Sequence, residues 1–282
     1  MKHKLMVGID YGLSNTDIVV RQHDGKLAYF TRSCAPNVSV MQIGATLNMI
    51  DLSIQQVGGL AVTGGQHQLL PDRVENIDIV KVPEVQAVGI GGLHLSGLTD
   101  ALVVSAGSGT AMMSAHLRGR KVQHVTGTAV GGGTLLGLAR LLLNTTDHTL
   151  IDALALAGNP NQVDLTLLEA TGGHLGKLPA DANAVNFGKL ARLPLQAALP
   201  SREDIAAGLV RLVGQVIAVI AINAARAEKL DQIVVIGHLV DLPSVRSVLQ
   251  TVAGYYGAKI TMPDHSGYGT ALGALRWMMS DS

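Results

Sequence analysis

Residues 124–143 read HVTGTAVGGGTLLGLARLLL, and the pattern of the stretch changes at its middle. Small and β-branched residues lead to three consecutive glycines, Gly131, Gly132 and Gly133 (the glycine triplet), and an apolar run with helical spacing follows. The pattern predicts a glycine-rich turn that opens a helix. We expect that helix to have one broad apolar face, formed by Leu135, Leu138, Leu141 and Leu142.

Two interpretations of the glycine triplet are open from these residues alone. Glycines at the start of a helix bring several unshielded N–H groups together, and the helix dipole adds partial positive charge, which favours phosphate. The plainer interpretation is a turn whose glycines let the helix pack closely against its neighbours. The rest of the chain has to decide between them.

The N-terminal part of the chain contains a second glycine turn. Residues 4–9 read as a buried strand that ends at Asp10, and residues 17–21 read as a returning strand. Such a hairpin can point a carboxylate and several N–H groups into a cleft. The carboxylate would then hold a hydrated Mg²⁺ ion, and the N–H groups would meet phosphate oxygens. The alternative is an ordinary hairpin whose aspartate and glycine only suit the turn.

A strand–turn–strand unit of the same kind recurs in the middle of the chain. Residues 101–105 and 111–116 read as strands on either side of the turn AGSGT. This recurrence predicts an α/β fold with two similarly built lobes around a cleft. We expect the lobes to comprise residues 1–98 and 99–282, and the last helix, 270–279, is able to return to the first lobe.

Two further elements matter for function and assembly. Glu84 lies between a predicted strand and a predicted helix, where the helix dipole favours a carboxylate, and it is also a candidate general base on the cleft wall. Residues 201–227 read as a long helix with Ser201 as its N-cap. Because this helix is apolar on nearly every face, we expect it to be buried or to face a second copy of the chain.

The composition excludes several classes of partner. Hydrophobic residues make up 48% of the 282 residues and aromatic residues only 3%, so the core must be aliphatic. Lys+Arg and Asp+Glu are equal at 21 each, and we expect neither nucleic acid nor a membrane as a partner. The single cysteine, Cys34, excludes an internal disulfide and suits a reducing, cytoplasmic location.

Taken in order, a series of segments resembles the type II pantothenate kinases of the actin, Hsp70 and sugar-kinase superfamily. The segments lie between residues 7 and 275 and read VGIDYGLSNT, LAVTGG, VPEVQAVGIGG, VVSAGSGTAMM, GTAVGGGTLLGLARLLL, ANAVNFGKL, IVVIG and GTALGAL. GGGTLLGL and NFGKL are more particular to this family than to the superfamily. The resemblance implies a two-lobed actin-like ATPase (ribonuclease H-like) fold, with ATP in the interlobe cleft and a homodimeric assembly.

The resemblance also implies a reaction, the phosphorylation of the primary hydroxyl of pantothenate by ATP with Mg²⁺, the first step towards coenzyme A. Asp10 matches the aspartate of the family's first phosphate motif, near Mg²⁺ through water. Gly12 matches the glycine of that motif, and Ser14 the position where the family has threonine. Glu84 matches the general base, which would accept the proton of the substrate hydroxyl.

The remaining matches lie on the nucleotide side of the family's site. The second phosphate loop is matched at four positions, Gly107, Ser108, Gly109 and Thr110. The glycine triplet matches the loop that closes over the nucleotide phosphates. Gly237 begins a turn that is similar to the family's adenosine-side loop. Three glycine loops facing one cleft favour the phosphate interpretation of the triplet.

The chain departs from the family at three places. Asp17 stands where the family usually has a lysine near phosphate. His124 stands where the family has an arginine that is implied in holding the pantothenate carboxylate, and a neutral histidine offers one donor in place of a planar fork. His238 and Leu239 replace a serine-rich turn. Arg118 or Arg120 could supply the missing charge, but both are more typical of a solvated turn.

Three functions are therefore compatible with the sequence. The first is a pantothenate kinase acting on pantothenate or a similar alcohol. The second, which Asp17 and His124 favour, is a kinase or ATPase of the same fold with another small substrate such as a sugar. The third is a weakly catalytic protein that binds nucleotide or coenzyme A and acts as a regulator. The presence of Glu84 argues against the third, because a binding module has no use for a base.

Overall fold

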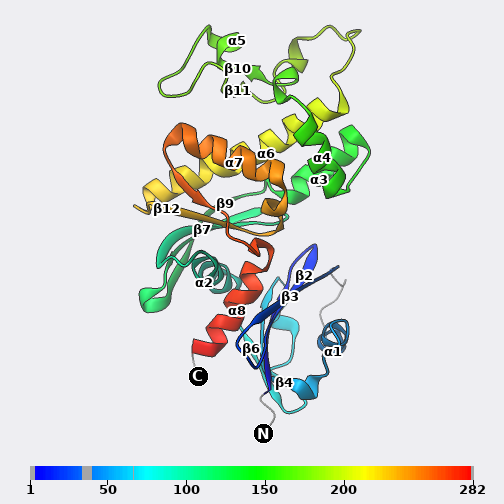
Figure 1. The fold of residues 1–282 in the computed structure, drawn as a ribbon, viewed down its shortest axis with the longest axis vertical. Helices are drawn as coiled ribbons and strands as arrows, with labels where there is room; N and C mark the ends of the chain where they lie inside the picture. The colour runs from blue at the N-terminus through cyan, green and yellow to red at the C-terminus, as the bar shows by residue number, and fades with distance from the viewer. Residues whose placement is uncertain (1–3, 34–39, 66, 281–282) are drawn as a thin grey trace.

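Two β-sheets with the same strand topology form the framework of the computed structural model, which describes residues 4–33, 40–65 and 67–280 (Figure 1). The first sheet contains β1 (Leu5–Tyr11), β2 (Asn15–Arg21), β3 (Leu27–Ser33), β4 (Val57–Gly64), β5 (Arg73–Val74) and β6 (Ile77–Lys81). The second sheet contains β7 (Asp100–Ala106), β8 (Thr110–His116), β9 (Lys121–Thr128), β12 (Gln232–Ile236) and β13 (Lys259–Thr261). A small separate sheet pairs β10 (Leu165–Thr166) with β11 (Asn183–Val185). Cys34 lies outside the described residues.

The strand order is β3-β2-β1-β4-β6-β5 in the first sheet and β9-β8-β7-β12-β13 in the second. In each sheet the leading strand, β1 or β7, pairs antiparallel with the next strand of the chain and parallel with a later one, β4 or β12. The predicted repetition of a strand–turn–strand unit is therefore confirmed. Both leading strands end at a glycine turn, so the repeat places two such turns at equivalent positions.

The helices surround and connect the two sheets. They are α1 (Val40–Asn48), α2 (Glu84–Ser96), α3 (Gly132–Leu143), α4 (His148–Ala157), α5 (Leu167–Thr171), α6 (Arg202–Ala227), α7 (Pro243–Tyr256) and α8 (Gly269–Ser280). Two short 3₁₀ helices also bear on the site, η6 (His238–Asp241) and η7 (Ser266–Tyr268).

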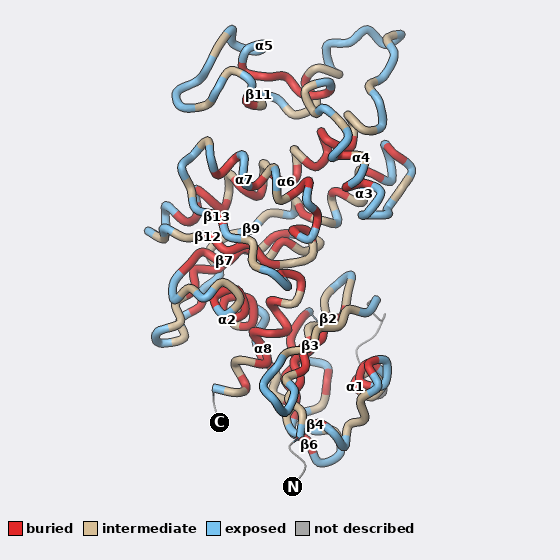
Figure 2. The backbone as a smooth tube through the Cα atoms, viewed as in Figure 1, coloured by how far each residue is buried: buried red, intermediate tan, exposed pale blue. Residues whose placement is uncertain are grey.

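The core is aliphatic, as the composition predicts. Ile9 and Ile18 of the first sheet, and Leu102 and Met112 of the second, are fully buried. Aliphatic and β-branched residues suit strands that are covered on both faces. Figure 2 shows that burial is concentrated in the sheets and in the helices packed against them, whereas the segment around α5 and β11 is largely exposed.

Helices α2 and α8 cross each other between the two sheets through backbone contacts (Figure 1). A Cβ atom at Gly91 would overlap the carbonyl oxygen of Gly269, and one at Gly273 would overlap that of Ala87. Helix α8, from the end of the chain, lies on the first sheet, where β1 approaches it closely at Gly8. Helix α2 lies against β7, β8 and β9 of the second sheet. The division of the chain into one lobe of residues 1–98 and another of residues 99–282 stays a prediction.

The glycine triplet opens α3, as predicted, but the buried face of that helix differs from our expectation. Leu135, Ala139 and Leu143 are buried, whereas Leu141 is 79% exposed and Leu142 is 52% exposed. The buried residues follow a spacing of four and face the core of the second lobe. The two exposed leucines lie outside this stripe, so the apolar run of the sequence covers more of the helix than the fold buries.

Helix α6 has the length and composition of a membrane span, but much of it lies inside the fold. Its most apolar window of 18 residues has a mean hydropathy of 2.3, and 61% of that window is buried. The helix packs against α3, α4 and α7. The predicted N-cap is confirmed, because Ser201 Oγ accepts a hydrogen bond from the N–H of Asp204 at 3.1 Å. These contacts are those of a core helix.

The α2–α8 crossing predicts an effect of opposite sign for two Gly→Ala substitutions. At Gly273 the added methyl group meets the backbone of α2, and we expect the free energy of unfolding to fall by about 1–3 kcal/mol. At Gly254, in α7, the methyl group meets open space, and we expect a gain of up to about 1 kcal/mol from helix propensity. Urea unfolding of both variants measures the difference. Equal stabilities would contradict the close crossing.

Candidate functional site

The first glycine turn lies at the carboxyl end of β1 and begins with Asp10. Asp10 pairs with Asp17 on β2 and with Thr63 on β4, so its backbone lies between these two strands. Its Oδ1 atom is enclosed and has no hydrogen-bond partner among the described residues. Gly64 has a φ of +96°, and a Cβ atom there would lie 2.7 Å from Asp10 Oδ1. The fold therefore encloses a carboxylate oxygen without satisfying it.

The electrostatic environment of Asp10 disfavours its charged form. Burial, followed by the negative charges of Glu84 and Asp17, raises the pKa of Asp10 to about 8, although His238 opposes the shift. A cation would reverse this effect. Among residues 4–33, 40–65 and 67–280, no group of three or more His, Cys, Asp or Glu side chains is placed to hold a metal ion. The enclosed oxygen of Asp10, which lacks a partner, is a type of donor that Mg²⁺ accepts, and the binding of Mg²⁺ at Asp10 stays a prediction.

The two glycine turns meet. Ser14 Oγ, in the β1–β2 turn, lies 2.8 Å from Ser108 Oγ, in the β7–β8 turn, although 94 residues separate them in the sequence. The fold therefore brings Gly12 and Ser14 beside Gly107, Ser108 and Gly109, as the sequence predicts for a shared site. The contact between the two serines is exposed, and each hydroxyl can donate to or accept from a ligand.

Thr110 has a structural partner. Its side chain is only 6% exposed, and its hydroxyl donates to the carbonyl oxygen of Val130 at 2.8 Å. The bond ties the β7–β8 turn to the segment that leads into α3. The predicted role of Thr110 in phosphate binding stays a prediction.

The glycine triplet packs directly on the β7–β8 turn. The N–H of Gly132 donates to the carbonyl oxygen of Gly107 at 2.8 Å, and the N–H of Gly133 donates to that of Ser108 at 2.9 Å. A Cβ atom at Gly131 would lie 2.7 Å from the carbonyl oxygen of Ser108. The expectation of unshielded N–H groups was wrong at Gly132 and Gly133, because close packing uses both. The triplet therefore shapes the second turn, and its contact with phosphate stays a prediction.

Gly237 joins the same region from the end of β12. Its φ is +104°, and a Cβ atom would overlap the carbonyl oxygen of Ala106, the last residue of β7. Its N–H donates to the carbonyl oxygen of Ser266 at 2.9 Å. Only glycine suits this conformation and this approach. The turn that follows Gly237 is consequently held against the β7–β8 turn.

His238, the next residue, reaches the first sheet. Its Nε2 lies 3.0 Å from Asp17 Oδ1, and its Nδ1 lies 2.7 Å from Asp241 Oδ2. Burial lowers the pKa of His238, but the hydrogen bonds and charges of Asp17 and Asp241 outweigh it and raise the pKa to about 10. The sequence marks Asp17 and His238 as separate departures from the family, and the structure brings them together.

Glu84 is the first residue of α2 and is exposed after Pro83. After burial, the negative charge of Glu84 contributes to the raised pKa of Asp10, so the two carboxylates are close enough to interact. Gln86, two residues further on, donates to the carbonyl oxygen of Val122 at 3.2 Å and so holds the start of α2 against β9. His124 is exposed on β9, two residues beyond Val122. Glu84 and His124 thus lie on neighbouring elements.

Neither Arg118 nor Arg120 supplies a charge to the site. Both lie in the β8–β9 turn, which is at the opposite end of β8 from the glycine turn. Arg120 donates to the carbonyl oxygen of Ser280 at 2.6 Å and lies over the ring of Trp277. The pKa of Asp100 is lowered mainly by the hydrogen bond from His116, and the positive charge of Arg118 adds a smaller contribution. Arg118 is exposed, as the plainer interpretation predicts, whereas Arg120 is partly buried against α8 and is not a solvated turn residue.

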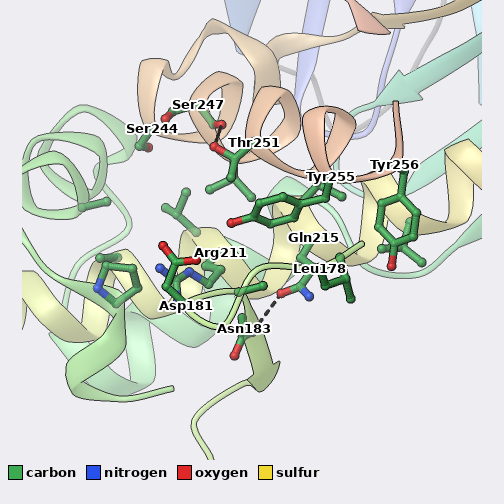
Figure 3. A pocket seen from close by; sticks show the side chains of 18 of the residues that line it. Leu178, Asp181, Asn183, Arg211, Gln215, Ser244, Ser247, Thr251, Tyr255 and Tyr256 are labelled. Carbon is green, nitrogen blue, oxygen red and sulfur yellow. Dashed lines mark hydrogen bonds between the residues drawn. The ribbon is translucent and has the colours of Figure 1, made fainter. Parts of the chain in front are cut away.

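A separate cavity of about 290 Å³ lies between α4, α6, α7 and residues 178–183 (Figure 3). Sequence reasoning missed it, because its lining comes from segments far apart in the chain. Arg211 in its wall donates to Asn161 Oδ1 at 2.6 Å and pairs with the buried carboxylate of Asp164 at 3.4 Å. Asn183 donates to Gln215 Oε1 at 2.8 Å. None of the predicted site residues lines this cavity.

A model of the Fumble family matches residues 94–276, which is well over half of the chain. The chain belongs to the Fumble family.

Relatives of this Fumble-family chain extend the match towards the N-terminus. A type II pantothenate kinase of Oceanobacillus iheyensis is 28% identical over 276 residues, which cover 95% of this chain and 98% of the relative. A type II pantothenate kinase of Staphylococcus aureus is 28% identical over 277 residues, which cover 96% and 98%. The resemblance that the motifs predict is confirmed, and it includes the first glycine turn.

Solved structures share the fold of this Fumble-family chain. The activator of 2-hydroxyisocaproyl-CoA dehydratase from Clostridium difficile, solved with bound ADPNP, matches with a TM-score of 0.68 and 15% identity, covering 98% of this chain and 95% of that one. A ROK family glucokinase from Streptomyces griseus, solved with glucose and AMPPNP, matches with a TM-score of 0.58 and 13% identity, covering 97% and 98%. The predicted two-lobed, actin-like ATPase fold with mixed sheets is confirmed.

The enclosed carboxylate predicts a substitution that stabilises the protein when nucleotide and Mg²⁺ are absent. The folded-state pKa of Asp10, about 8, lies above its ordinary value of 3.8, so stability is lost as pH rises towards and through 8. Asp10→Asn removes this loss. We expect Tm to rise by at least about 2 °C at pH 8.5 and to change little near pH 4.

Asp100→Asn is the matched control for this experiment. A hydrogen bond from His116 lowers the pKa of Asp100, so its substitution should lower Tm at neutral pH. Differential scanning calorimetry across the pH range measures both variants. A fall in Tm for Asp10→Asn at pH 8.5 would show that the carboxylate is not strained by its surroundings.

Proposed function

We propose that this chain is an ATP-dependent kinase that phosphorylates the primary hydroxyl of pantothenate, the first step of coenzyme A biosynthesis. The observation that carries the proposal is the meeting of the two glycine turns beside Asp10 and Glu84. The relatives named type II pantothenate kinase, which align over nearly the whole chain, support pantothenate as the substrate. The neighbours solved with ADPNP and AMPPNP support ATP as the phosphate donor.

Glu84 is the general base of this mechanism. An alcohol attacks phosphorus efficiently only when its proton has an acceptor, and Glu84 is exposed at the start of α2 beside the first turn. The substrate oxygen forms a bond to the γ-phosphorus, the bond from that phosphorus to the β–γ bridging oxygen breaks, and ADP leaves. Glu84 receives the hydroxyl proton. The turns around Gly12 and Gly107 position the phosphates, so catalysis depends on alignment and charge.

Mg²⁺ fits the residues at the first turn. Asp10 has an enclosed oxygen without a partner and a pKa that burial and neighbouring carboxylates raise, and carboxylate oxygen is the donor that Mg²⁺ prefers. Asp10 would hold the ion through water. When bound, Mg²⁺ supplies positive charge that offsets the charge of the phosphate oxygens.

A second candidate function is favoured by His124. The residue is exposed on β9 near the start of α2, where the family has an arginine, and neutral imidazole is a weaker partner for a carboxylate than a guanidinium fork. A kinase of the same fold that acts on an uncharged alcohol or sugar would need no such fork. ADP release measured with pantothenate, pantetheine, common sugars and no substrate separates the two functions. Turnover only with a sugar would contradict pantothenate, and nucleotide binding without any turnover would indicate a regulator.

We also propose that the protein is a homodimer. Exposed apolar side chains gather on α3, α4 and the segment that follows α5, including Leu141, Leu156 and Leu195, and Leu195 is 99% exposed. Figure 2 shows that much of the segment around α5 and β11 is exposed, which agrees with this proposal. Burying these side chains would stabilise a dimer. Light scattering should give twice the chain mass of 29.4 kDa, and the monomer mass would contradict the proposal.

Substitution of Glu84 tests the proposed base. We expect Glu84→Gln, and likewise Glu84→Ala, to lower kcat by about 100-fold or more while the affinity for ADP changes by less than about twofold, because the base acts in the chemical step. Glu228→Gln, at the exposed end of α6, is the control for losing a surface carboxylate. Steady-state kinetics and ADP titration measure both variants. Normal turnover of Glu84→Gln would exclude Glu84 as the base.

A further inference from the structure

One charged contact joins the first sheet to the turn after β12. Asp17 lies on β2, next to the first glycine turn, and His238 lies at the start of η6, next to Gly237. His238 Nε2 is 3.0 Å from Asp17 Oδ1, across a separation of 221 residues. The other ring nitrogen, Nδ1, is 2.7 Å from Asp241 Oδ2. With a carboxylate on each nitrogen, the ring is doubly protonated and positively charged.

Both members of this contact are held in place by other groups. Asp17 is 5% exposed, and its Oδ1 also accepts a hydrogen bond from Thr31 Oγ1 at 2.7 Å. The His238 ring packs on the backbone of η7, where a Cβ atom at Gly267 would overlap it. The ring of Tyr268 lies edge-on to His238, with centroids 5.7 Å apart. The fold thus determines the position of the pair.

The pair lies beside the residues of the proposed reaction. Asp17 is the cross-strand partner of Asp10, and the charges of Asp17 and His238 act on Asp10 in opposite directions. Without a cation, Asp17 would add a second negative charge next to the phosphates. The imidazolium of His238 offsets that charge. The groups that face it are Asp17, Asp241, Asp10 and Tyr268, with His265 and Tyr29 stacked beyond Tyr268.

We propose that Asp17 and His238 form a cross-lobe clamp that holds the first glycine turn against the second lobe and offsets the negative charge that Asp17 brings to the phosphate site. His238 is a positioning residue, since it acts through Asp17 and the turns. The identity of the ligand rests on the proposed kinase function. The Ser14–Ser108 contact also links the first glycine turn to the second lobe, at the β7–β8 turn, but it joins neutral, exposed hydroxyls. A charge-assisted and partly buried bond is the stronger of the two.

The chain provides a matched control for the clamp. His116 Nδ1 lies 2.6 Å from Asp100 Oδ1, so the same two residue types form the same bond at the end of the second sheet that is remote from the glycine turns. His116→Gln removes a histidine–aspartate bond without touching the site. If His238→Gln weakens ADP binding and His116→Gln does not, the effect comes from the location of the His238–Asp17 bond beside the site. Loss of a histidine–aspartate bond in general would affect both variants.

The experiment measures ADP affinity, kcat and the KM values of both substrates for His238→Gln, Asp17→Asn, their double variant and His116→Gln. We expect His238→Gln to weaken ADP binding and to raise KM for ATP by about 10-fold, with KM for pantothenate changed by less than about twofold. The double variant should be no weaker than His238→Gln, because both changes break one contact. His116→Gln should bind ADP like the unmodified protein.

Two further readouts separate the clamp from a merely structural role. His238→Lys keeps the cation and should recover ADP affinity to within about threefold of the unmodified protein, whereas loss of packing alone would not be rescued. In Asp17→Asn the histidine has one carboxylate fewer, which lowers its pKa. The ratio of ADP affinities, variant to unmodified protein, should therefore fall as pH rises from about 6.5 to about 8.5. A ratio that stays constant would contradict the clamp.

The test also distinguishes the clamp from the proposed function. ADP affinity needs no turnover, so the clamp is tested even if pantothenate is not phosphorylated. Weaker ADP binding of His238→Gln alone, without pantothenate turnover in the unmodified protein, would support the clamp and overturn pantothenate as the substrate. Unchanged ADP affinity in His238→Gln, with normal turnover, would overturn the clamp and leave the kinase assignment intact.

Discussion

Backbone packing at the end of β7 is the constraint on which the rest of the site depends. The β7–β8 turn receives the glycine triplet on one side and Gly237 on the other, and both contacts are too close for a side chain. Hydrogen bonds from Gly132 and Gly133 fix the triplet to the turn. Since the turn is fixed in this way, the β1–β2 turn of the first sheet has a defined surface to meet at Ser108. The glycines therefore act first as spacers that set the position of the turn, and their contact with phosphate belongs to the proposed function.

Charge is the second constraint, and it arises from the repeat itself. The hairpin of the first sheet brings Asp10 and Asp17 together as cross-strand partners, and the start of α2 adds Glu84. Such a set of carboxylates is unstable without cations, which is a usual property of sites that bind phosphate with a metal ion. The positively charged ring of His238 offsets the negative charge of Asp17. The buried negative charge of Asp10 destabilises the folded protein, and a bound cation would offset that charge. The carboxylate that the proposed function needs is therefore one that lowers stability when no cation is bound.

The sequence predicted the fold more fully than the site. Long apolar strands and the recurring glycine hairpins indicated two similar lobes, because each strand pattern is local and each hairpin is short. The prediction of the buried face of α3 was wrong, because Leu141 and Leu142 are as apolar as the buried leucines and no local sequence feature distinguishes them. Asp17 and His238 were each noticed, but a contact across 221 residues has no local signature. The cavity beside Arg211 was missed for the same reason, because α4, α6 and α7 each supply only part of its wall.

The central claim is that phosphate and substrate meet where the two glycine turns meet. A crystal structure of the protein with AMPPNP, Mg²⁺ and pantothenate tests it most directly. We expect nucleotide phosphates between the turns at Gly12 and Gly107, the metal ion near Asp10, and the pantothenate hydroxyl within hydrogen-bond distance of Glu84. Phosphates bound elsewhere, for instance in the cavity beside Arg211, or a pantothenate hydroxyl remote from Glu84, would contradict it.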